Sequence, residues 1–141
     1  MCFPTPTFFI ESDKNIGENY TNWLTKRSKS LMRHDRKKGN TVHPIGHYRQ
    51  ALHTAMIRSQ GFDEYSGEPI NWSLAFTNRN GKVGAKSRRK FSDAPSVDHI
   101  TGGGLGVAIC RDDTNTAKGC MTPADLHAFC KAVASRPPRF C

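Results

Sequence analysis

The sequence predicts an α+β fold, in which two basic N-terminal helices lie beside a short β-hairpin that leads into a helix, and a closing helix follows at the C-terminal end. Three observations predict it: helical spacing of apolar residues in the first half, a glycine-rich turn between two short apolar segments, and an acidic pair that opens the next helix. With 141 residues we expect one compact unit, in which residues 1–61 form a basic helical arm and residues 62–141 form an α+β core.

Residue spacing in the first half predicts two helices. The first is expected from Asn19 to Lys38, a stretch without Pro or Gly, and Gly39 ends it. The second is expected from about His47 to Gln60, and Gly61 ends it. Apolar residues recur at helical spacing in both, which predicts a buried stripe on each. These residues are Tyr20, Trp23, Leu24, Leu31 and Met32 in the first helix, and Tyr48, Ala51, Leu52, Ala55 and Met56 in the second.

Residues 62–76 differ in composition from the segment before them, because they are rich in aromatic and turn-forming residues. The segment Ser66-Gly67-Glu68-Pro69 predicts a turn between two short extended pieces. Residues 77–92 are polar and carry several glycines and a run of basic residues, so we expect a loop that either is simply solvated or grips a phosphate backbone.

The hairpin is predicted between residues 94 and 110, where two apolar segments flank the glycine-rich turn at 101–106. Asp112 and Asp113 then open a short helix, because acidic groups favour helix N-termini, and Gly119 closes it. The last helix begins after Thr122, a capping residue followed by a proline. Its predicted apolar stripe is Leu126, Phe129, Cys130 and Val133.

The net charge of +9 is concentrated in one part of the chain. Residues 14–60 carry ten basic and two acidic side chains, a local balance of +8. A concentrated positive field attracts polyanions, so DNA is the expected partner and RNA is an open alternative. The basic residues could also form an ordinary solvated surface without a nucleic-acid partner. The candidate nucleic-acid contacts are Lys26, Arg27, Arg33, Arg36, Lys37 and Lys38 in the first helix and Lys86, Arg88, Arg89 and Lys90 in the polar loop.

The cysteines and the N-terminal residues indicate the cellular compartment in which the protein is expected. Five cysteines without a Cys-x-x-Cys pair favour free thiols over a disulfide framework or a zinc knuckle. The first ten residues have no basic flank and two prolines, which fits neither a signal peptide nor a membrane span. We therefore expect a cytoplasmic protein of a prokaryotic or phage type, a monomer or a homodimer without a membrane partner.

Four residues near the hairpin carry the chemistry of phosphodiester hydrolysis. His99 has an imidazole whose ordinary pKa suits a general base that activates water at neutral pH. Asp98 and Asn115 supply oxygen ligands, which Mg²⁺ or Mn²⁺ prefers. Lys118 lies one helical turn after Asn115 and would neutralise phosphate charge. Neighbours on a regular strand point to opposite faces, so Asp98 and His99 are expected to meet at a frayed or bulged strand end.

These residues resemble the HNH (ββα-metal, His-Me finger) endonucleases. The likeness rests on Pro95-Ser96-Val97-Asp98-His99-Ile100, the glycine-rich turn, the strand that ends at Cys110 and Asn115-x-x-Lys118-Gly119, and it extends from residue 62 to about 130. It implies a ββα-metal finger, with His99 as the base and Asp98 and Asn115 on one divalent ion. Many members carry paired cysteines that bind structural zinc, whereas Tyr65 and Ser66 stand where the first pair would be, so no structural zinc is expected here.

The function expected is therefore hydrolysis of DNA phosphodiester bonds by an endonuclease. The alternatives are a non-catalytic basic nucleic-acid-binding module on a degenerate finger and a zinc-dependent interaction domain. His127, beside the apolar stripe of the last helix, is expected to be a partly buried packing residue rather than a further site residue. His34, His43, His47 and His53 are expected at the surface or on phosphates.

Overall fold

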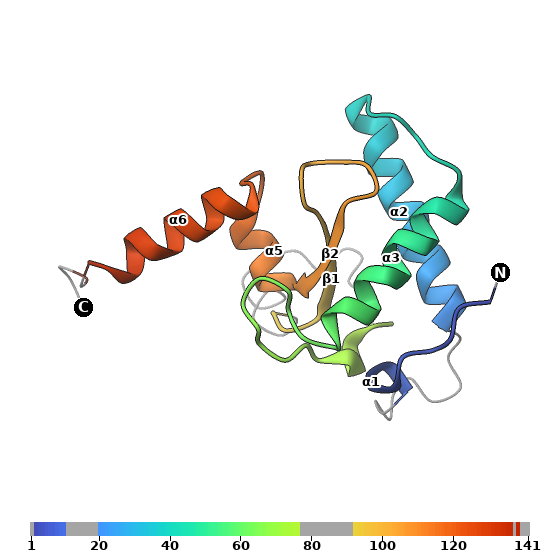
Figure 1. The fold of residues 1–141 in the computed structure, drawn as a ribbon, viewed down its shortest axis with the longest axis horizontal. Coiled ribbons are helices and arrows are strands. Elements are labelled where there is room, and N and C mark those ends of the chain that lie inside the picture. The colour runs from blue at the N-terminus through green and yellow to red at the C-terminus, as the bar shows by residue number, and fades with distance from the viewer. Residues whose placement is uncertain (1, 11–19, 77–91, 137, 139–141) are drawn as a thin grey trace.

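The computed structural model describes residues 2–10, 20–76, 92–136 and 138, and has the predicted α+β character (Figure 1). Five α-helices, one 3-10 helix and a two-stranded sheet occur in these residues. In chain order they are α1 (Thr7–Ile10), α2 (Tyr20–Lys38), α3 (Ile45–Ser59), the 3-10 helix η2 (Trp72–Leu74), β1 (Pro95–His99), β2 (Val107–Arg111), α5 (Asp112–Lys118) and α6 (Pro123–Ala134).

The hairpin is antiparallel and regular. Pro95 pairs with Arg111 at one end and His99 pairs with Val107 at the other, so the ladder continues through Asp98 to the last residue of β1. The predicted bulge or frayed end is therefore wrong: the glycines sit in the turn, where Gly102 and Gly104 take positive φ angles of 86° and 79°, and leave the strand intact.

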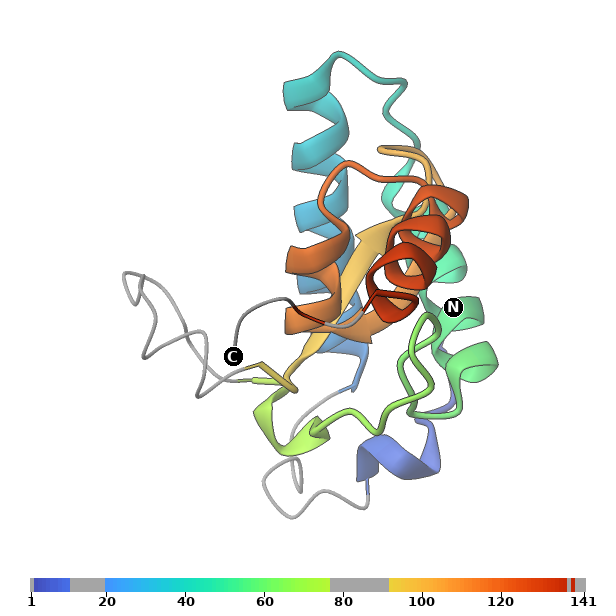
Figure 2. The same cartoon turned by 90° about the vertical axis from the view of Figure 1, so that its left-hand side faces the viewer.

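Helices cover the hairpin from both sides. α2 and α3 pack together, α3 packs on β2, and α5 contacts both strands. In Figure 2, α5 and α6 lie in front of the hairpin and α2 and α3 behind it. α5 lies against the hairpin because it begins directly after the last residue of β2.

One hydrophobic core joins the two predicted parts of the chain. Phe9 contacts Trp23 edge to face with ring centroids 5.8 Å apart, and Trp23 contacts Trp72 at 5.9 Å. The core also includes Tyr48 of α3 and Ile109 of β2, both with 0% exposure. Buried aromatic surface of this kind is a large stabilising term, so the helices on the N-terminal side and the hairpin are held by shared contacts.

Helix boundaries agree with the spacing argument to within two residues. α3 begins at Ile45, two residues before the predicted start, and Gln60 takes a left-handed conformation with φ 52° directly before Gly61. The predicted extended pieces around residues 66–69 reduce to one bridge between Phe62 and Pro69. The predicted loop at 77–92 lies outside the described residues apart from its last position.

α6 extends away from the rest of the molecule (Figure 1). It begins at a capping box in which Thr122 and Asp125 exchange hydrogen bonds, as the Thr-Pro-x-Asp pattern predicts. Its predicted packing is wrong, however: Leu126 is its one buried residue, whereas Phe129 and Val133 are 57% and 59% exposed. His127 is also exposed rather than partly buried. An apolar stripe is buried only where another element packs against it, and periodicity does not reveal that partner.

Of the helices in the described part of the chain, none combines the length and the apolarity needed to cross a membrane.

Candidate active site

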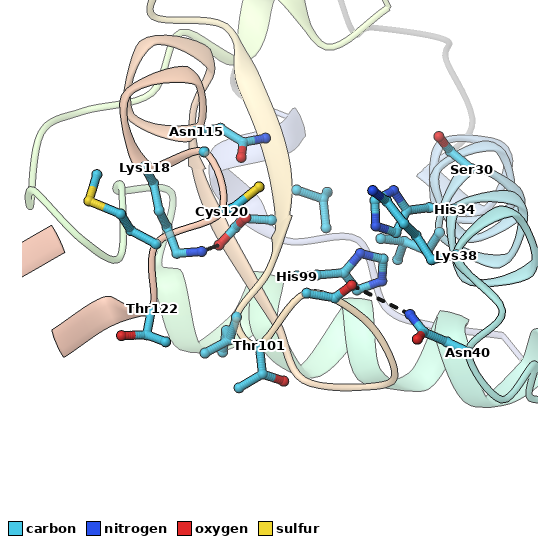
Figure 3. Close-up of a pocket in the computed structure, with 17 residues that line it drawn as sticks. Ser30, His34, Lys38, Asn40, His99, Thr101, Asn115, Lys118, Cys120 and Thr122 are labelled. Atoms are coloured by element: carbon cyan, nitrogen blue, oxygen red, sulfur yellow. Dashed lines mark hydrogen bonds and ion pairs between the residues drawn. The ribbon is translucent and has the colours of Figure 1, made fainter. Parts of the chain in front are cut away.

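A cleft of about 610 Å³ lies where α2, the end of the hairpin and the segment from α5 to α6 come together (Figure 3). The four residues that the sequence marks for chemistry, Asp98, His99, Asn115 and Lys118, all line it. The opposite wall belongs to α2. The other lining residues are Ser30, Leu31, His34, Lys38, Asn40, Val97, Ile100, Thr101, Gly102, Gly119, Cys120, Met121 and Thr122.

On the α5 side, Asp98 is the centre of a buried polar cluster. Tyr65 donates its hydroxyl to Asp98 Oδ2 at 2.7 Å, and Lys118 Nζ lies 3.0 Å from the same oxygen. The side chains of Lys118 and Asp98 are only 2% and 7% exposed. Burial and the hydrogen bond to Asp98 raise the pKa of Tyr65, which therefore stays a neutral donor. The other carboxylate oxygen, Oδ1, has no hydrogen-bond partner among the described residues.

Tyr65 reaches Asp98 because the segment before it is fastened to β2. Asp63 accepts a hydrogen bond from the backbone N–H of Arg111 at 2.7 Å, and Glu64 accepts one from Ile109 at 2.7 Å. Tyr65 follows directly, and its own N–H donates to Asp63 Oδ1 at 2.8 Å. These carboxylates satisfy the backbone N–H groups of Ile109 and Arg111 on the outer edge of β2.

Asn115 is oriented by β1. Its side-chain amide nitrogen donates to Ser96 Oγ at 2.8 Å, and its carbonyl oxygen has no hydrogen-bond partner among the described residues. α5 begins with Asp112 and Asp113, which suit a helix N-terminus, and ends at Gly119, whose φ is 52°. A short helix between two such ends presents Asn115 and Lys118 on one face, one turn apart.

His99 points the other way, toward α2 (Figure 3). It is 9% exposed, and its Nε2 lies 3.9 Å from Asp35 Oδ1 without a hydrogen-bond partner among the described residues. The ring of His34 lies beside it, with centroids 4.8 Å apart. Burial lowers the pKa of His99, and the Asp35 carboxylate opposes that shift. The imidazole is therefore neutral at pH 7, the state that a general base requires.

The side chains of Asp98 and His99 thus lie on opposite faces of β1. Asp98 contacts Tyr65 and α5, whereas His99 contacts α2, as alternation along a regular strand demands. They border a common cleft because β1 ends at His99 and the cleft extends around that end.

Asp35 of α2 is the site residue that sequence reasoning missed. It is fully buried, and Tyr48 donates its hydroxyl to Asp35 Oδ2 at 2.5 Å. Asn40 Nδ2 and the N–H of Gly104 donate to Oδ1 at 3.2 and 3.1 Å. Burial disfavours the anion, but these hydrogen bonds together lower the pKa of Asp35 below its ordinary value. One signal was present: Asp35 falls four residues after Leu31, on the apolar stripe of a basic helix.

On the α2 side, the exposed residues that line the cleft are polar, and one of them is a lysine. Ser30, His34 and Lys38 line it at intervals of four residues, one above the other on the helix, and all three are exposed. The other predicted nucleic-acid contacts of α2 do not line the cleft. Of these, Lys26, Arg33, Arg36 and Lys37 are exposed, and Arg27 is partly buried beside the Trp23 ring, with its guanidinium 3.4 Å from the Pro95 carbonyl.

The remaining predicted residues do not line the cleft or lie outside the described residues. His127 is exposed on α6 and does not line the cleft. His53 was expected at the surface, but it is 8% exposed and bonded to the Tyr20 hydroxyl at 3.0 Å, because it falls on the face of α3 that meets α2. Lys86, Arg88, Arg89 and Lys90 lie outside the described residues.

The donor set of the cleft fits a hard divalent cation. No three His, Cys, Asp or Glu side chains gather into a metal-binding group within the described residues. Asp98 and Asn115 nevertheless line the cleft, and each has one side-chain oxygen without a hydrogen-bond partner among the described residues. Mg²⁺ commonly takes one or two protein oxygens and keeps water in its remaining positions.

No family model, curated protein or solved structure matches the chain.

Proposed function

We propose that the protein is a metal-dependent endonuclease of the HNH (ββα-metal) type that hydrolyses phosphodiester bonds of DNA. One observation carries the proposal: Asp98, His99, Asn115 and Lys118, all from one hairpin and the helix that follows it, border a single cleft, and the opposite wall on α2 carries an exposed lysine, Lys38. A hydrolase for a polyanion needs a neutral base, oxygen ligands for a cation and positive charge for phosphate. His99 is the base, Asp98 and Asn115 carry the oxygens, and Lys38 on the α2 wall provides exposed positive charge.

In this mechanism His99 accepts a proton from the water that attacks phosphorus. Asp98 and Asn115 would hold Mg²⁺ or Mn²⁺ through their free oxygens, and a bound ion would stabilise negative charge on the phosphate and the leaving oxygen. Tyr65 and Ser96 keep those two side chains in place by hydrogen bonds at 2.7 and 2.8 Å. Lys118 neutralises Asp98 in the free protein and lies close enough to the cleft to meet a phosphate.

DNA is the substrate that the charge distribution favours. The excess of +8 over residues 14–60 includes α2, which forms one wall of the cleft. Basic side chains on that helix would hold the sugar-phosphate backbone across the cleft without reading bases.

A plasmid assay tests this function. Supercoiled DNA is incubated with the protein and Mg²⁺, with the protein and a chelator, and with His99→Ala and Mg²⁺. We expect nicked or linear product only in the first reaction, since removal of a general base costs about 10²- to 10⁴-fold in rate. Cutting that survives both treatments would contradict the proposal.

A second function, a non-catalytic nucleic-acid-binding module, is favoured by one specific contact. Lys118 already pairs with the carboxylate of Asp98 in a buried position, so no divalent ion is needed to neutralise that charge. The same assay separates the two functions when a gel retardation lane is added: retardation without any cutting in Mg²⁺ or Mn²⁺ identifies the binding module.

A further inference from the structure

We propose that Asp35 is a positioning residue for His99: its carboxylate holds the proton on Nε2 of the imidazole, so that Nδ1 is the nitrogen that accepts a proton from water. This inference rests on the proposed function for the role of Nδ1, while the state of the ring itself can be tested without any nuclease activity. Asp35 belongs to α2, outside the hairpin and helix that carry the other site residues.

The geometry singles out one nitrogen of the ring. Asp35 Oδ1 lies 3.9 Å from His99 Nε2, and both side chains are buried, with 0% and 8% exposure. Nε2 has neither accessible surface nor a hydrogen-bond partner in the described part of the chain. A buried polar atom without a hydrogen bond is costly, so the Asp35 carboxylate 3.9 Å away bears on the state of this nitrogen.

Electrostatics then selects the tautomer. With the proton on Nε2, a positively polarised N–H group lies 3.9 Å from a carboxylate oxygen. With the proton on Nδ1, the lone pair of Nε2 lies near the same anion instead. The first arrangement is attractive and the second repulsive, and burial of both groups strengthens the difference. In the favoured state the lone pair is on Nδ1.

Asp35 is also held firmly enough to act on His99. Tyr48, Asn40 and the N–H of Gly104 all donate to its carboxylate. The glycine-rich turn packs so closely here that a Cβ on Gly103 would come within 2.1 Å of Asn40 Nδ2 and 2.8 Å of Asp35 Oδ1. The carboxylate therefore links α2, α3 and the turn that follows His99.

The direct test is a measurement on histidine rings in the metal-free protein. Two-bond ¹H–¹⁵N correlation spectra distinguish the two neutral tautomers, and exposed His47 of α3 provides an internal control. We expect His99 to be a single Nε2–H tautomer in the wild type and a mixture in Asp35→Asn, with His47 unchanged. An Nδ1–H ring in the wild type, or the same spectrum in the variant, would overturn the inference.

A variant that keeps the carboxylate extends the test if Asp35→Asn does not fold. Tyr48→Phe removes one donor to Asp35 and leaves the charge in place. Release from that donor lets the carboxylate move relative to the ring, so the Nε2 resonance of His99 should shift while that of His47 does not. No shift in a folded Tyr48→Phe protein counts against the inference.

Activity supplies a separate measurement. Asp35→Asn should lower kcat by about 10- to 100-fold, the usual effect of losing a partner that orients a site residue, with unchanged affinity for DNA. Tyr48→Phe should lose stability but much less of kcat. Equal losses of kcat in the two variants would indicate a purely structural carboxylate. If the wild type does not cut DNA, the proposed function fails, and the spectra still decide whether Asp35 sets the tautomer.

Discussion

The two walls of the cleft carry their charges in different ways. On the α5 side, Lys118 and Asp98 are both buried and pair with each other, so that wall is close to neutral. On the α2 side, His34 and Lys38 are exposed, and the one acidic group, Asp35, is buried behind them. Buried, paired charges fix geometry, whereas exposed charges attract a ligand. We infer that the hairpin and α5 provide the chemistry and that α2 provides the grip on the substrate.

The largest effect is expected where a buried charge loses its partner. Lys118→Met keeps most of the side-chain volume but leaves the Asp98 carboxylate buried without its cation. We expect a loss of about 3 to 5 kcal/mol in the free energy of unfolding, measured by urea titration. Lys131→Met, on the exposed face of α6, is the matched control and should change little. A loss as small as that of the control would mean that the α5 wall does not depend on the ion pair.

Within the wall formed by the hairpin and α5, a proposed ligand and the residue that orients it should differ in their effect on activity. Asn115→Ala removes a proposed ligand and should lower the rate of Mg²⁺-dependent nicking by about 100-fold. Ser96→Ala removes only the hydroxyl that orients the Asn115 amide at 2.8 Å, so its loss should be smaller. Raised Mg²⁺ should restore Ser96→Ala more than Asn115→Ala. A larger loss in the serine variant would contradict the assigned roles.

A smaller effect is expected where the turn meets α2. Gly103→Ala would bring a methyl group against Asn40 and Asp35. The cost should be about 2 kcal/mol in the free energy of unfolding, within the range for overpacking. Asn40 can move aside only by giving up its hydrogen bond to Asp35, and the buried Asp35 carboxylate is also in the way. Gly106 lies in the same turn with open space around it, so Gly106→Ala is the control. Equal stability of the two variants would show that the turn does not pack on Asp35 as described.

The smallest effect belongs to the exposed wall. The double variant His34→Ala, Lys38→Ala should weaken DNA binding a few-fold and reduce the slope of log K against log salt concentration by about 1, as expected for one lost phosphate contact. The control, His47→Ala, removes an exposed histidine that does not line the cleft. Fluorescence anisotropy with a labelled duplex at several salt concentrations measures both quantities. An unchanged slope would exclude Lys38 from the interface.

Local chemistry explains which features could be predicted from the sequence. The bounds of α2 and α5 follow from spacing, end residues and glycines, all of which act within a few residues. Likewise the hairpin follows from two apolar segments around a glycine-rich turn. These are short-range effects, and the structure differs from the predicted bounds by only one or two residues at most ends.

Features set by distant contacts could not be predicted in the same way. The exposure of Phe129 and Val133 depends on whether another element covers α6. The roles of Tyr65 and Asp35 depend on Asp98 and His99, which are remote in sequence. A carboxylate on an apolar stripe was the available sign for Asp35, but its partner is visible only in three dimensions.

The central claim is that one cleft joins the oxygens of Asp98 and Asn115 with the imidazole of His99. Crystals soaked in Mn²⁺ and measured for anomalous scattering test it most directly. We expect one peak in contact with the carboxylate of Asp98 and the amide oxygen of Asn115. Crystals that bind Mn²⁺ elsewhere, with the Lys118–Asp98 ion pair intact, would contradict it.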